Sequence, residues 1–137
     1  MIDILIEPTQ TTPFVKIDSD EGLISFKGKS SPENSLGFYH PIIDKIKVLF
    51  ADTDKPINAN FSFRYFNTSS SKCLFDLFKA LRQMMIENGK EIIINWFYEE
   101  DDDDMMETGE DFSDLLDIDF NLIPVEDISE ISLREAV

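Results

Sequence analysis

The sequence predicts one α/β domain, built as a mixed sheet with an N-terminal hairpin and with helices mainly on one face. Residues 57–66 alternate between apolar and polar side chains, as a half-buried strand does. Residues 72–87 then repeat apolar side chains at helical spacing. The whole order is hairpin, helix, strand, helix, strand, helix, strand, and strand–helix–strand units produce parallel strands. We expect the domain to span residues 1–125, with residues 126–137 as a tail or short helix.

The N-terminal part predicts three short strands. Residues 2–6 form a strand or arm that Pro8 ends. Residues 14–17 and 23–26 are apolar runs on either side of the turn-forming residues 18–22, a pattern typical of a β-hairpin. We expect this hairpin to lie beside the parallel strands.

A first helix is expected from residues 31–35 onward. Ser31 is the expected cap, with Pro32 in the first turn, where its missing N–H has no partner to lose. Apolar residues keep helical spacing until the pattern ends near Asp52. Pro41 lies inside or just before that pattern, so it either kinks the helix or delays its start.

The strand at residues 57–66 has two different faces. Ile57, Ala59, Phe61, Phe63 and Tyr65 point to one side, and Asn58, Asn60, Ser62 and Arg64 point to the other. This alternation suits a sheet that helices cover on one face and that is more open on the second. The helix that follows is expected to end at Asn88-Gly89, because glycine readily adopts the left-handed conformation found after a helix.

The last third of the chain predicts a strand, a helix and a strand. The near-continuous apolar run at residues 92–98 is typical of a central strand. The acidic residues 99–104 are expected to form a solvated, mobile loop. A weaker helix then carries the apolar residues Met106, Phe112, Leu115 and Leu116. Residues 120–125 are the expected last strand.

The composition favours a folded and acidic protein. Apolar residues make up 42% of the chain and aromatic residues 12%, which argues against disorder. The formal net charge of −16 argues against nucleic acid and anionic membranes as partners, because their binders present basic patches. Partners with basic faces would be attracted, unless the acidity only keeps the domain soluble.

The N-terminal residues and the single cysteine bear on the cellular compartment. The N-terminus carries Asp3 and Glu7 and has no basic segment or long apolar stretch, so a cytoplasmic protein is expected. The lone Cys73 excludes an internal disulfide and a cysteine-based zinc cluster. Its apolar neighbours predict a buried, inert thiol.

No catalytic, cofactor or metal site is predicted. His40 is the single histidine, and no nucleophile motif or glycine-rich phosphate loop accompanies it. The acidic run at residues 99–104 lacks the alternating oxygen ligands of a calcium loop, and Gly109 comes too late for its sharp turn. A weak magnesium site, or attraction for a basic partner, is the alternative to a solvated loop there.

A cluster of hydroxyl and amide side chains separates the strand at residues 57–66 from the next helix. The cluster contains Asn67, Thr68, Ser69, Ser70 and Ser71, with Lys72 directly after it. One of these residues is expected to cap the helix, because capping uses a single side-chain oxygen. A phosphate here would add roughly 1.5 to 2 negative charges, which the helix N–H groups and Lys72 would accept. Phosphorylation would then switch partner binding without unfolding the domain.

Two motifs, found together in this order, resemble the SiaC family of bacterial regulatory phosphoproteins. The first is Ser31-Pro32-Glu33-Asn34-Ser35, and the second is Tyr65-Phe66-Asn67-Thr68-Ser69-Ser70-Ser71-Lys72, each before a helix. Residues 9–13 and the aromatic triplet Trp96-Phe97-Tyr98 also resemble the family. The similarity covers roughly residues 5–125.

The resemblance implies a fold similar to STAS-like anti-sigma-factor-antagonist domains and a role in partner switching. A cognate Ser/Thr protein kinase would phosphorylate the threonine of the Asn-Thr-Ser-Ser motif, here Thr68, and a PP2C-type phosphatase would remove the phosphate. The unmodified form would bind an effector, which in one branch of the family is a diguanylate cyclase of cyclic di-GMP signalling. The remaining loop and partner contacts would come from Asn67, Ser69, Ser70, Ser71 and Lys72, and from Pro32, Glu33, Asn34 and Ser35.

The residues alone leave alternatives open. They do not select Thr68 over Ser69 as the phosphate acceptor. A small hydrolase or transferase with a seryl or threonyl nucleophile at residues 68–71 also fits, as does a constitutive acidic adaptor without a switch. The function we expect is a non-enzymatic regulator that is switched at Thr68.

Overall fold

The computed structural model describes residues 2–130, and within them six strands form one sheet. The strands are β1 (Ile4–Ile6), β2 (Phe14–Asp18), β3 (Leu23–Ser30), β4 (Ile57–Phe66), β5 (Ile92–Glu99) and β6 (Phe120–Val125). The helices are α1 (Ser35–Leu49), α2 (Thr68–Asn88), α3 (Asp103–Leu116) and the 3-10 helix η1 (Ile128–Glu130). The expected C-terminal tail or short helix is therefore described only as far as η1, and residues 131–137 lie outside the described residues.

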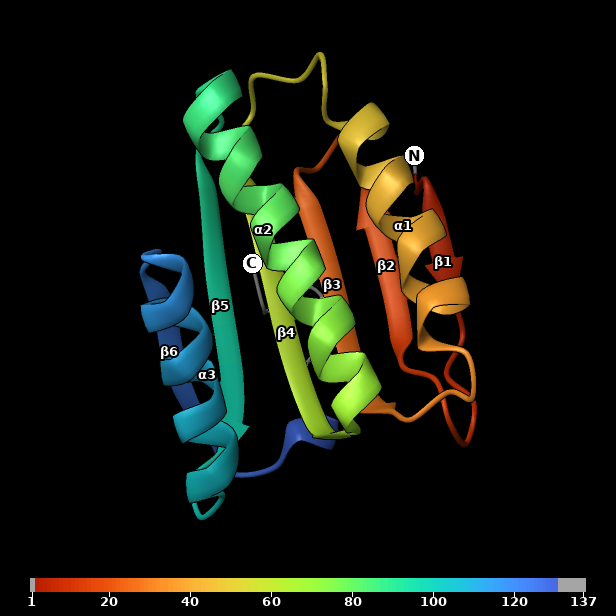
Figure 1. Cartoon of the computed structure of the whole chain (residues 1–137), viewed down its shortest axis with the longest axis vertical. Helices are drawn as coiled ribbons and strands as arrows, with labels where there is room; N and C mark the ends of the chain where they lie inside the picture. The colour runs from red at the N-terminus through yellow and green to blue at the C-terminus, as the bar shows by residue number, and fades with distance from the viewer. Residues whose placement is uncertain (1, 131–137) are drawn as a thin grey trace.

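The strands lie side by side in the order in which they occur in the sequence. The pairs β1–β2 and β2–β3 are antiparallel, whereas β3–β4, β4–β5 and β5–β6 are parallel. A helix joins the two members of each parallel pair, as Figure 1 shows. The predicted mixed sheet, with an N-terminal hairpin beside parallel strands, is confirmed.

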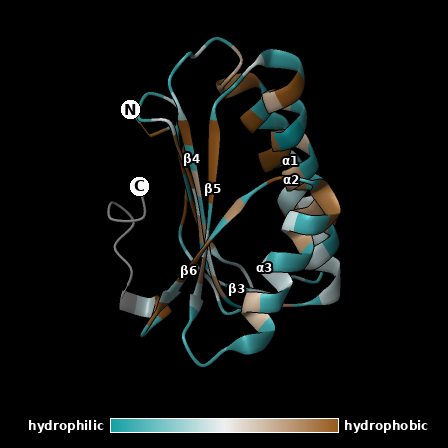
Figure 2. Cartoon of the chain, turned by 90° about the vertical axis from the view of Figure 1, so that its left-hand side faces the viewer, coloured by the Kyte–Doolittle hydropathy of each residue, from teal (hydrophilic) through white to brown (hydrophobic). Residues whose placement is uncertain are grey.

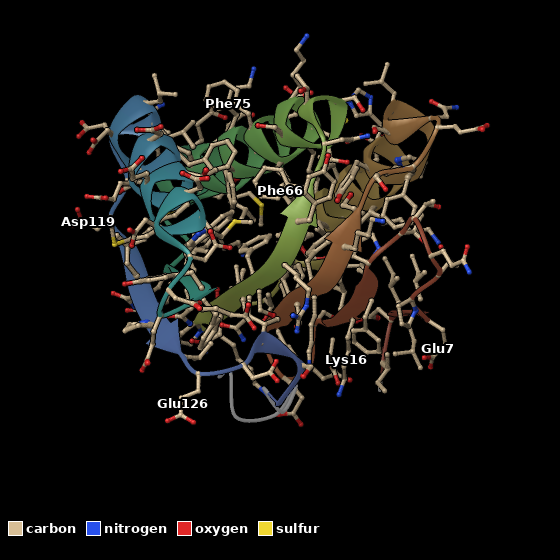
Figure 3. The ribbon with its side chains drawn as sticks, turned by 90° about the horizontal axis from the view of Figure 1, so that it is seen from below. Glu7, Lys16, Phe66, Phe75, Asp119 and Glu126 are labelled. Atoms are coloured by element: carbon tan, nitrogen blue, oxygen red, sulfur yellow. The ribbon has the colours of Figure 1, made fainter. Side chains whose placement is uncertain are left out.

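All three α-helices described cover the same face of the sheet, and η1 lies on the other side (Figure 2). Between sheet and helices lies an aromatic core around Trp96 and Phe78. The ring centroids of Phe78 are 4.9 Å from those of both Phe61 and Phe120. Figure 3 shows Phe66 inside this layer. The burial of these rings supplies the apolar area that holds the layers together.

A β-bulge reverses the alternation of β4 near its end. Gly28 of β3 is opposite Phe63, but Lys29 is opposite Tyr65, so Arg64 is an extra residue on β4. An extra residue turns each later side chain to the other face of the sheet. Tyr65, expected inside, is therefore 51% exposed, and Phe66 turns inward to contact Trp96.

The second face of the sheet is less open than its polar residues predict. A row of hydrogen-bonded side-chain amides crosses β6, β5 and β4. Asn121 donates to Asn95 at 3.0 Å, and Asn95 donates to Asn60 at 2.7 Å. The segment leading to η1 is held over this face, since Arg64 pairs with Asp127 at 3.1 Å. Asn60 and Ser62 are consequently buried, although they point away from the helices.

Both predictions for the start of α1 are corrected. Asn34, not Ser31, caps the helix, because its side-chain oxygen accepts from the Gly37 N–H at 3.0 Å. Ser31 is still in the connection from β3, where its N–H donates to the Thr11 carbonyl at 2.7 Å. Pro32 therefore precedes the helix, and Pro41 lies within it and does not delay its start.

The acidic run at residues 99–104 is not the expected mobile loop, because Glu99 ends β5 and Asp103 and Asp104 begin α3. Asp102 caps the helix by accepting from the Met105 N–H at 3.0 Å, and Asp103 and Asp104 form its first turn. Carboxylates are favourable there, because they complement the positive end of the helix dipole. The helix buries Met105, Gly109, Phe112 and Leu116, whereas Leu115 is 72% exposed.

Candidate functional site

The two motifs found in the sequence form the neighbouring N-termini of α1 and α2. β3 and β4 are adjacent parallel strands, so the helices that follow them begin at the same edge of the sheet. Each helix has an asparagine cap, Asn34 for α1 and Asn67 for α2. The Asn67 side chain accepts from the Ser70 N–H at 2.9 Å. Helix α2 therefore begins at Thr68, and the hydroxyl cluster forms its first turn, where a loop was expected.

Ser70 is a structural residue at the base of this site. Its side chain is fully buried, and its hydroxyl lies 2.8 Å from that of Ser30 at the end of β3. The Ser30 hydroxyl also lies 2.6 Å from the phenol oxygen of Tyr39 on α1. Burial raises the pKa of Tyr39, so its phenol remains protonated and available to this network. The network fixes β3, α1 and α2 relative to one another.

Ser69 joins the two motifs directly. Its hydroxyl lies 2.7 Å from the hydroxyl of Ser35, the first residue of α1, and donates to the Asn67 side chain at 3.2 Å. These contacts hold Ser69 against the first turn of the neighbouring helix. The structure thus places Asn67, Ser69 and Ser35 together.

Thr68 and Ser69 are both exposed, but within the described residues the Thr68 hydroxyl makes no hydrogen bond, whereas the Ser69 hydroxyl is bonded to Ser35 and Asn67. Thr68 is the first residue of α2, and the N–H groups of the first turn precede the intrahelical ladder. Lys72 follows one turn later, is also exposed, and shares this face of the helix. Thr68 is therefore the hydroxyl in residues 68–70 that an incoming enzyme can reach without breaking an existing contact.

The remaining residues of the two motifs differ in their surroundings. Pro32 is buried before α1, whereas Glu33 is exposed and makes no hydrogen bond or ion pair among residues 2–130. Asn34 and Ser35 are occupied by the cap and by the bridge to Ser69. Ser71 is half-buried on α2, between Ser70 and Lys72.

No hydroxyl in this cluster contacts a general base in the described part of the chain. His40 lies on α1 with its Nε2 3.4 Å from Asp76 of α2, and both side chains are substantially exposed. A Ser or Thr nucleophile requires a base within hydrogen-bonding distance. Among residues 2–130, no group of three or more His, Cys, Asp or Glu side chains is arranged to hold a metal ion.

The sequence did not indicate the hydrogen-bond network beneath the site or the apolar hollow beside it. Ser30 and Tyr39 gave no signal, because their contact with Ser70 depends on tertiary packing. The exposed apolar residues Leu36 and Leu115 lie beside α2 and line a hollow with Lys72 and Phe75. The 4–3 spacing of Thr68, Lys72 and Phe75 in the sequence would have indicated this second face of α2.

Comparison with known proteins assigns the chain to a family. Residues 6–125 match the SiaC family regulatory phosphoproteins. The chain belongs to the SiaC family. A relative from Pseudomonas aeruginosa strain UCBPP-PA14 is 31% identical to this SiaC-family chain over 112 residues, covering 82% of it and 88% of the relative.

Solved structures of SiaC from Pseudomonas aeruginosa share this fold. The apo-SiaC crystal structure matches with a TM-score of 0.76 and 31% identity, over 90% of this chain and 98% of that one. A crystal structure of the diguanylate cyclase SiaD in complex with its activator SiaC also matches, with a TM-score of 0.79 and 30% identity. The match covers 89% of this chain and 98% of the matched chain. The single α/β domain is therefore the fold of the SiaC family, while the likeness to STAS-like domains remains an implication of the resemblance.

Within residues 2–130, no helix of this SiaC-family protein is long and apolar enough to cross a bilayer.

Proposed function

We propose that this SiaC-family protein is a non-enzymatic, cytoplasmic partner switch controlled by reversible phosphorylation of Thr68. A Ser/Thr protein kinase adds the phosphate, and a PP2C-type phosphatase removes it. The unphosphorylated form binds an effector, which we propose to be a diguanylate cyclase, because a related SiaC is the activator of the diguanylate cyclase SiaD.

The observation that carries this proposal is the separation of roles among three adjacent hydroxyls. Ser70 is buried in the network with Ser30, and Ser69, although exposed, is bonded to Ser35, whereas Thr68 is exposed and its hydroxyl has no hydrogen-bond partner among residues 2–130. A phosphate on Thr68 would stand at the positive end of α2 and one turn before Lys72, so the domain would accept its charge without rearrangement. This geometry favours Thr68 over Ser69, a choice that the sequence left open.

The test uses the chain purified with an affinity tag from the bacterium that encodes it, grown with phosphatase inhibitors. Peptide mass spectrometry of residues 67–72 is expected to find phosphate on Thr68. Diguanylate cyclase activity that co-purifies with the chain is measured as cyclic di-GMP formed from GTP. The Thr68→Ala protein is expected to retain this activity, and the Thr68→Asp protein is expected to lose much of it. Ser69→Ala is the matched control and is expected to leave the phosphorylation of Thr68 in place.

Other outcomes would favour the other functions. Equal co-purification with Thr68→Ala and Thr68→Asp would favour a constitutive acidic adaptor. Turnover of ester or phosphoester substrates, lost in Thr68→Ala, would favour a hydrolase or transferase. Effector binding that is absent in a well-folded Thr68→Ala protein would contradict the switch.

A further inference from the structure

The two motifs of the site contact each other through one pair of hydroxyl groups. The hydroxyl of Ser35, the first residue of α1, lies 2.7 Å from the hydroxyl of Ser69 on α2. The Ser35 residue is only 4% exposed, whereas Ser69 is exposed to solvent. The contact therefore joins a hydroxyl that an incoming protein can reach to one that it cannot.

The hydrogen bonds around Ser69 can be assigned a direction. A serine hydroxyl has one proton to donate and two lone pairs that accept. Ser69 donates its proton to the side-chain oxygen of Asn67 at 3.2 Å, and the same oxygen accepts from the Ser70 N–H. The proton between Ser35 and Ser69 must therefore come from Ser35. Both the proton and one lone pair of the Ser69 hydroxyl are occupied.

Phosphoryl transfer requires the groups that Ser69 has already committed. The acceptor oxygen bonds to the γ-phosphorus of a nucleoside triphosphate, the bond from that phosphorus to the leaving nucleoside diphosphate breaks, and the hydroxyl proton passes to a base of the kinase. The Thr68 hydroxyl is free to do this, because it has no hydrogen-bond partner among residues 2–130. Ser69 must first give up its bonds to Ser35 and Asn67.

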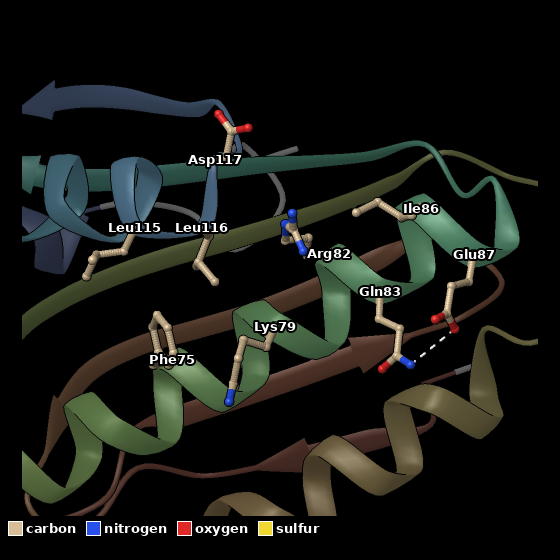
Figure 4. Close-up of a pocket in the computed structure, with 9 residues that line it drawn as sticks. All are labelled: Phe75, Lys79, Arg82, Gln83, Ile86, Glu87, Leu115, Leu116 and Asp117. Carbon is tan, nitrogen blue, oxygen red and sulfur yellow. Dashed lines mark hydrogen bonds between the residues drawn. The ribbon is translucent and has the colours of Figure 1, made fainter.

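The two candidate acceptors also lie on different sides of α2. Residues seven apart lie on the same face of a helix, because seven residues make about two turns. Ser69 is seven residues before Asp76, whose carboxylate contacts a side chain of α1. Thr68 is seven residues before Phe75, which lies opposite Leu115 of α3 (Figure 4). The first turn of α1 therefore acts on Ser69 and leaves Thr68 unrestrained.

We propose that Ser35 is a specificity-determining residue, whose hydroxyl holds Ser69 out of the reaction and so directs the kinase to Thr68. This inference rests on the proposed function and adds how the acceptor is chosen. Because Ser35 is buried, it acts through Ser69 and does not need to contact the kinase. The first motif thereby controls the chemistry of the second.

The first experiment measures the ratio of phosphate on Ser69 to phosphate on Thr68. The tagged chain is purified from the native bacterium grown with phosphatase inhibitors, and peptides covering residues 67–72 are quantified by mass spectrometry against synthetic phosphopeptides. Ser35→Ala is expected to raise the ratio about two- to tenfold, because Ser69 then has one hydrogen bond fewer to break. Helix α1 keeps its cap in this variant, since Asn34 is unchanged.

Three further variants separate the loss of the donor from a general loosening of the helix. Ser31→Ala is the matched control, because the Ser31 hydroxyl of the same motif makes no hydrogen bond among residues 2–130, and it is expected to leave the ratio unchanged. Ser35→Thr keeps a hydroxyl at this position and is expected to restore the ratio. In the Thr68→Ala protein, adding Ser35→Ala is expected to raise phosphate on Ser69 by a similar factor. Thermal unfolding checks that every variant folds.

The second experiment tests the contact between Ser35 and Ser69 without a kinase. Three-bond NMR couplings of the Ser69 β-protons report whether its χ1 angle occupies one rotamer or averages over several. One rotamer is expected in the unchanged chain and in Ser31→Ala, and averaging is expected in Ser35→Ala. Averaging in the unchanged chain would overturn the proposed role of Ser35.

The two proposals fail in different ways. An equal ratio in Ser35→Ala and Ser31→Ala, with phosphate on Thr68 throughout, would overturn the role of Ser35 and leave the Thr68 switch standing. A rise of phosphate on Ser71 as large as the rise on Ser69 would indicate general loosening and would also overturn that role. Phosphate mainly on Ser69 in the unchanged chain, or none on residues 67–72 in any variant, would overturn both proposals.

Discussion

Side chains of nearly the same chemistry have different tasks within one turn of α2. Ser70 contributes to stability, because its buried hydroxyl bonds to Ser30 beneath the helix. Ser69 connects two helices, and Thr68 faces solvent. The difference arises from position on the helix, since each residue turns by about 100° relative to the one before.

Ser70→Ala is expected to destabilise the fold by about 1 to 3 kcal/mol, because it leaves buried partners around Ser30 with an unsatisfied bond. Thr68→Ala is expected to change the free energy of unfolding by no more than about 0.5 kcal/mol, since Asn67 and not Thr68 caps the helix. Urea unfolding followed by the fluorescence of the single tryptophan, Trp96, measures both. Equal costs for the two variants would contradict these roles.

At the scale of elements, caps and close contacts decide where each helix begins and how it lies on the sheet. The three asparagine and aspartate caps, Asn34, Asn67 and Asp102, each accept from the N–H three residues later. Helix α3 also approaches the sheet closely at Gly109, directly over Trp96. Trp96 in turn donates to the Met105 carbonyl of α3 at 3.0 Å.

Gly109→Ala is expected to destabilise the domain by about 1 to 3 kcal/mol, because the added methyl group would lie 2.5 Å from the Trp96 Cδ1 atom. The helix must move away, and the hydrogen bond from Trp96 to Met105 must lengthen. A shift of the tryptophan emission maximum together with a lower urea midpoint would show this. Glu110→Ala, on the exposed side of the same helix, is the control and should leave the emission maximum unchanged.

The segment that leads to η1 should respond to acid. Hydrogen bonds from the Ser129 hydroxyl and amide, followed by the pairing with Arg64, lower the pKa of Asp127 below its usual value of about 3.9. The carboxylate therefore stabilises this turn above pH about 4, and the stabilisation is lost as the pH falls through the lowered folded-state pKa.

An NMR titration of the Ser129 amide is expected to show a midpoint below about 3.9, and Asp127→Asn should abolish it. Arg64→Gln should move the midpoint upward only in part, because the bonds from Ser129 remain. A midpoint at or above the usual carboxyl value in the unchanged chain would mean that the turn does not form in solution.

At the scale of the whole molecule, the sheet and its helical layer enclose one continuous core. Cys73 lies on the inner face of α2 within that core and is 1% exposed. Burial, together with the nearby Asp76 carboxylate, raises the pKa of its thiol. The thiolate, which is the reactive form, is therefore scarce as well as inaccessible.

The native chain is expected to react with a thiol reagent at least about 10³-fold more slowly than the chain in concentrated urea, because labelling of Cys73 requires the domain to open. Labelling rates measured across a urea series should follow the stability obtained from tryptophan fluorescence. Rapid labelling under native conditions, with fluorescence unchanged, would show that α2 opens separately from the rest of the core.

Much of the architecture was predictable because it depends on local patterns. The alternation at residues 57–66 and the helical repeat at 72–87 identified β4 and α2, and the order of elements indicated the parallel strands. The predictions that were wrong are those that depend on a single residue. The bulge at Arg64 turned Tyr65 outward, and Asn34 took the cap that was assigned to Ser31.

The sequence by itself determined the fold class, the family and the segment that carries the candidate site, because periodicity and the two motifs are local properties of the chain. Only the tertiary structure separated Thr68 from Ser69 and Ser70, and only it joined Leu36, Phe75 and Leu115 into one groove. These features depend on which side chains from distant segments meet across α1, α2, α3 and β3. Such contacts are set by the packing of whole elements, and no local pattern specifies them.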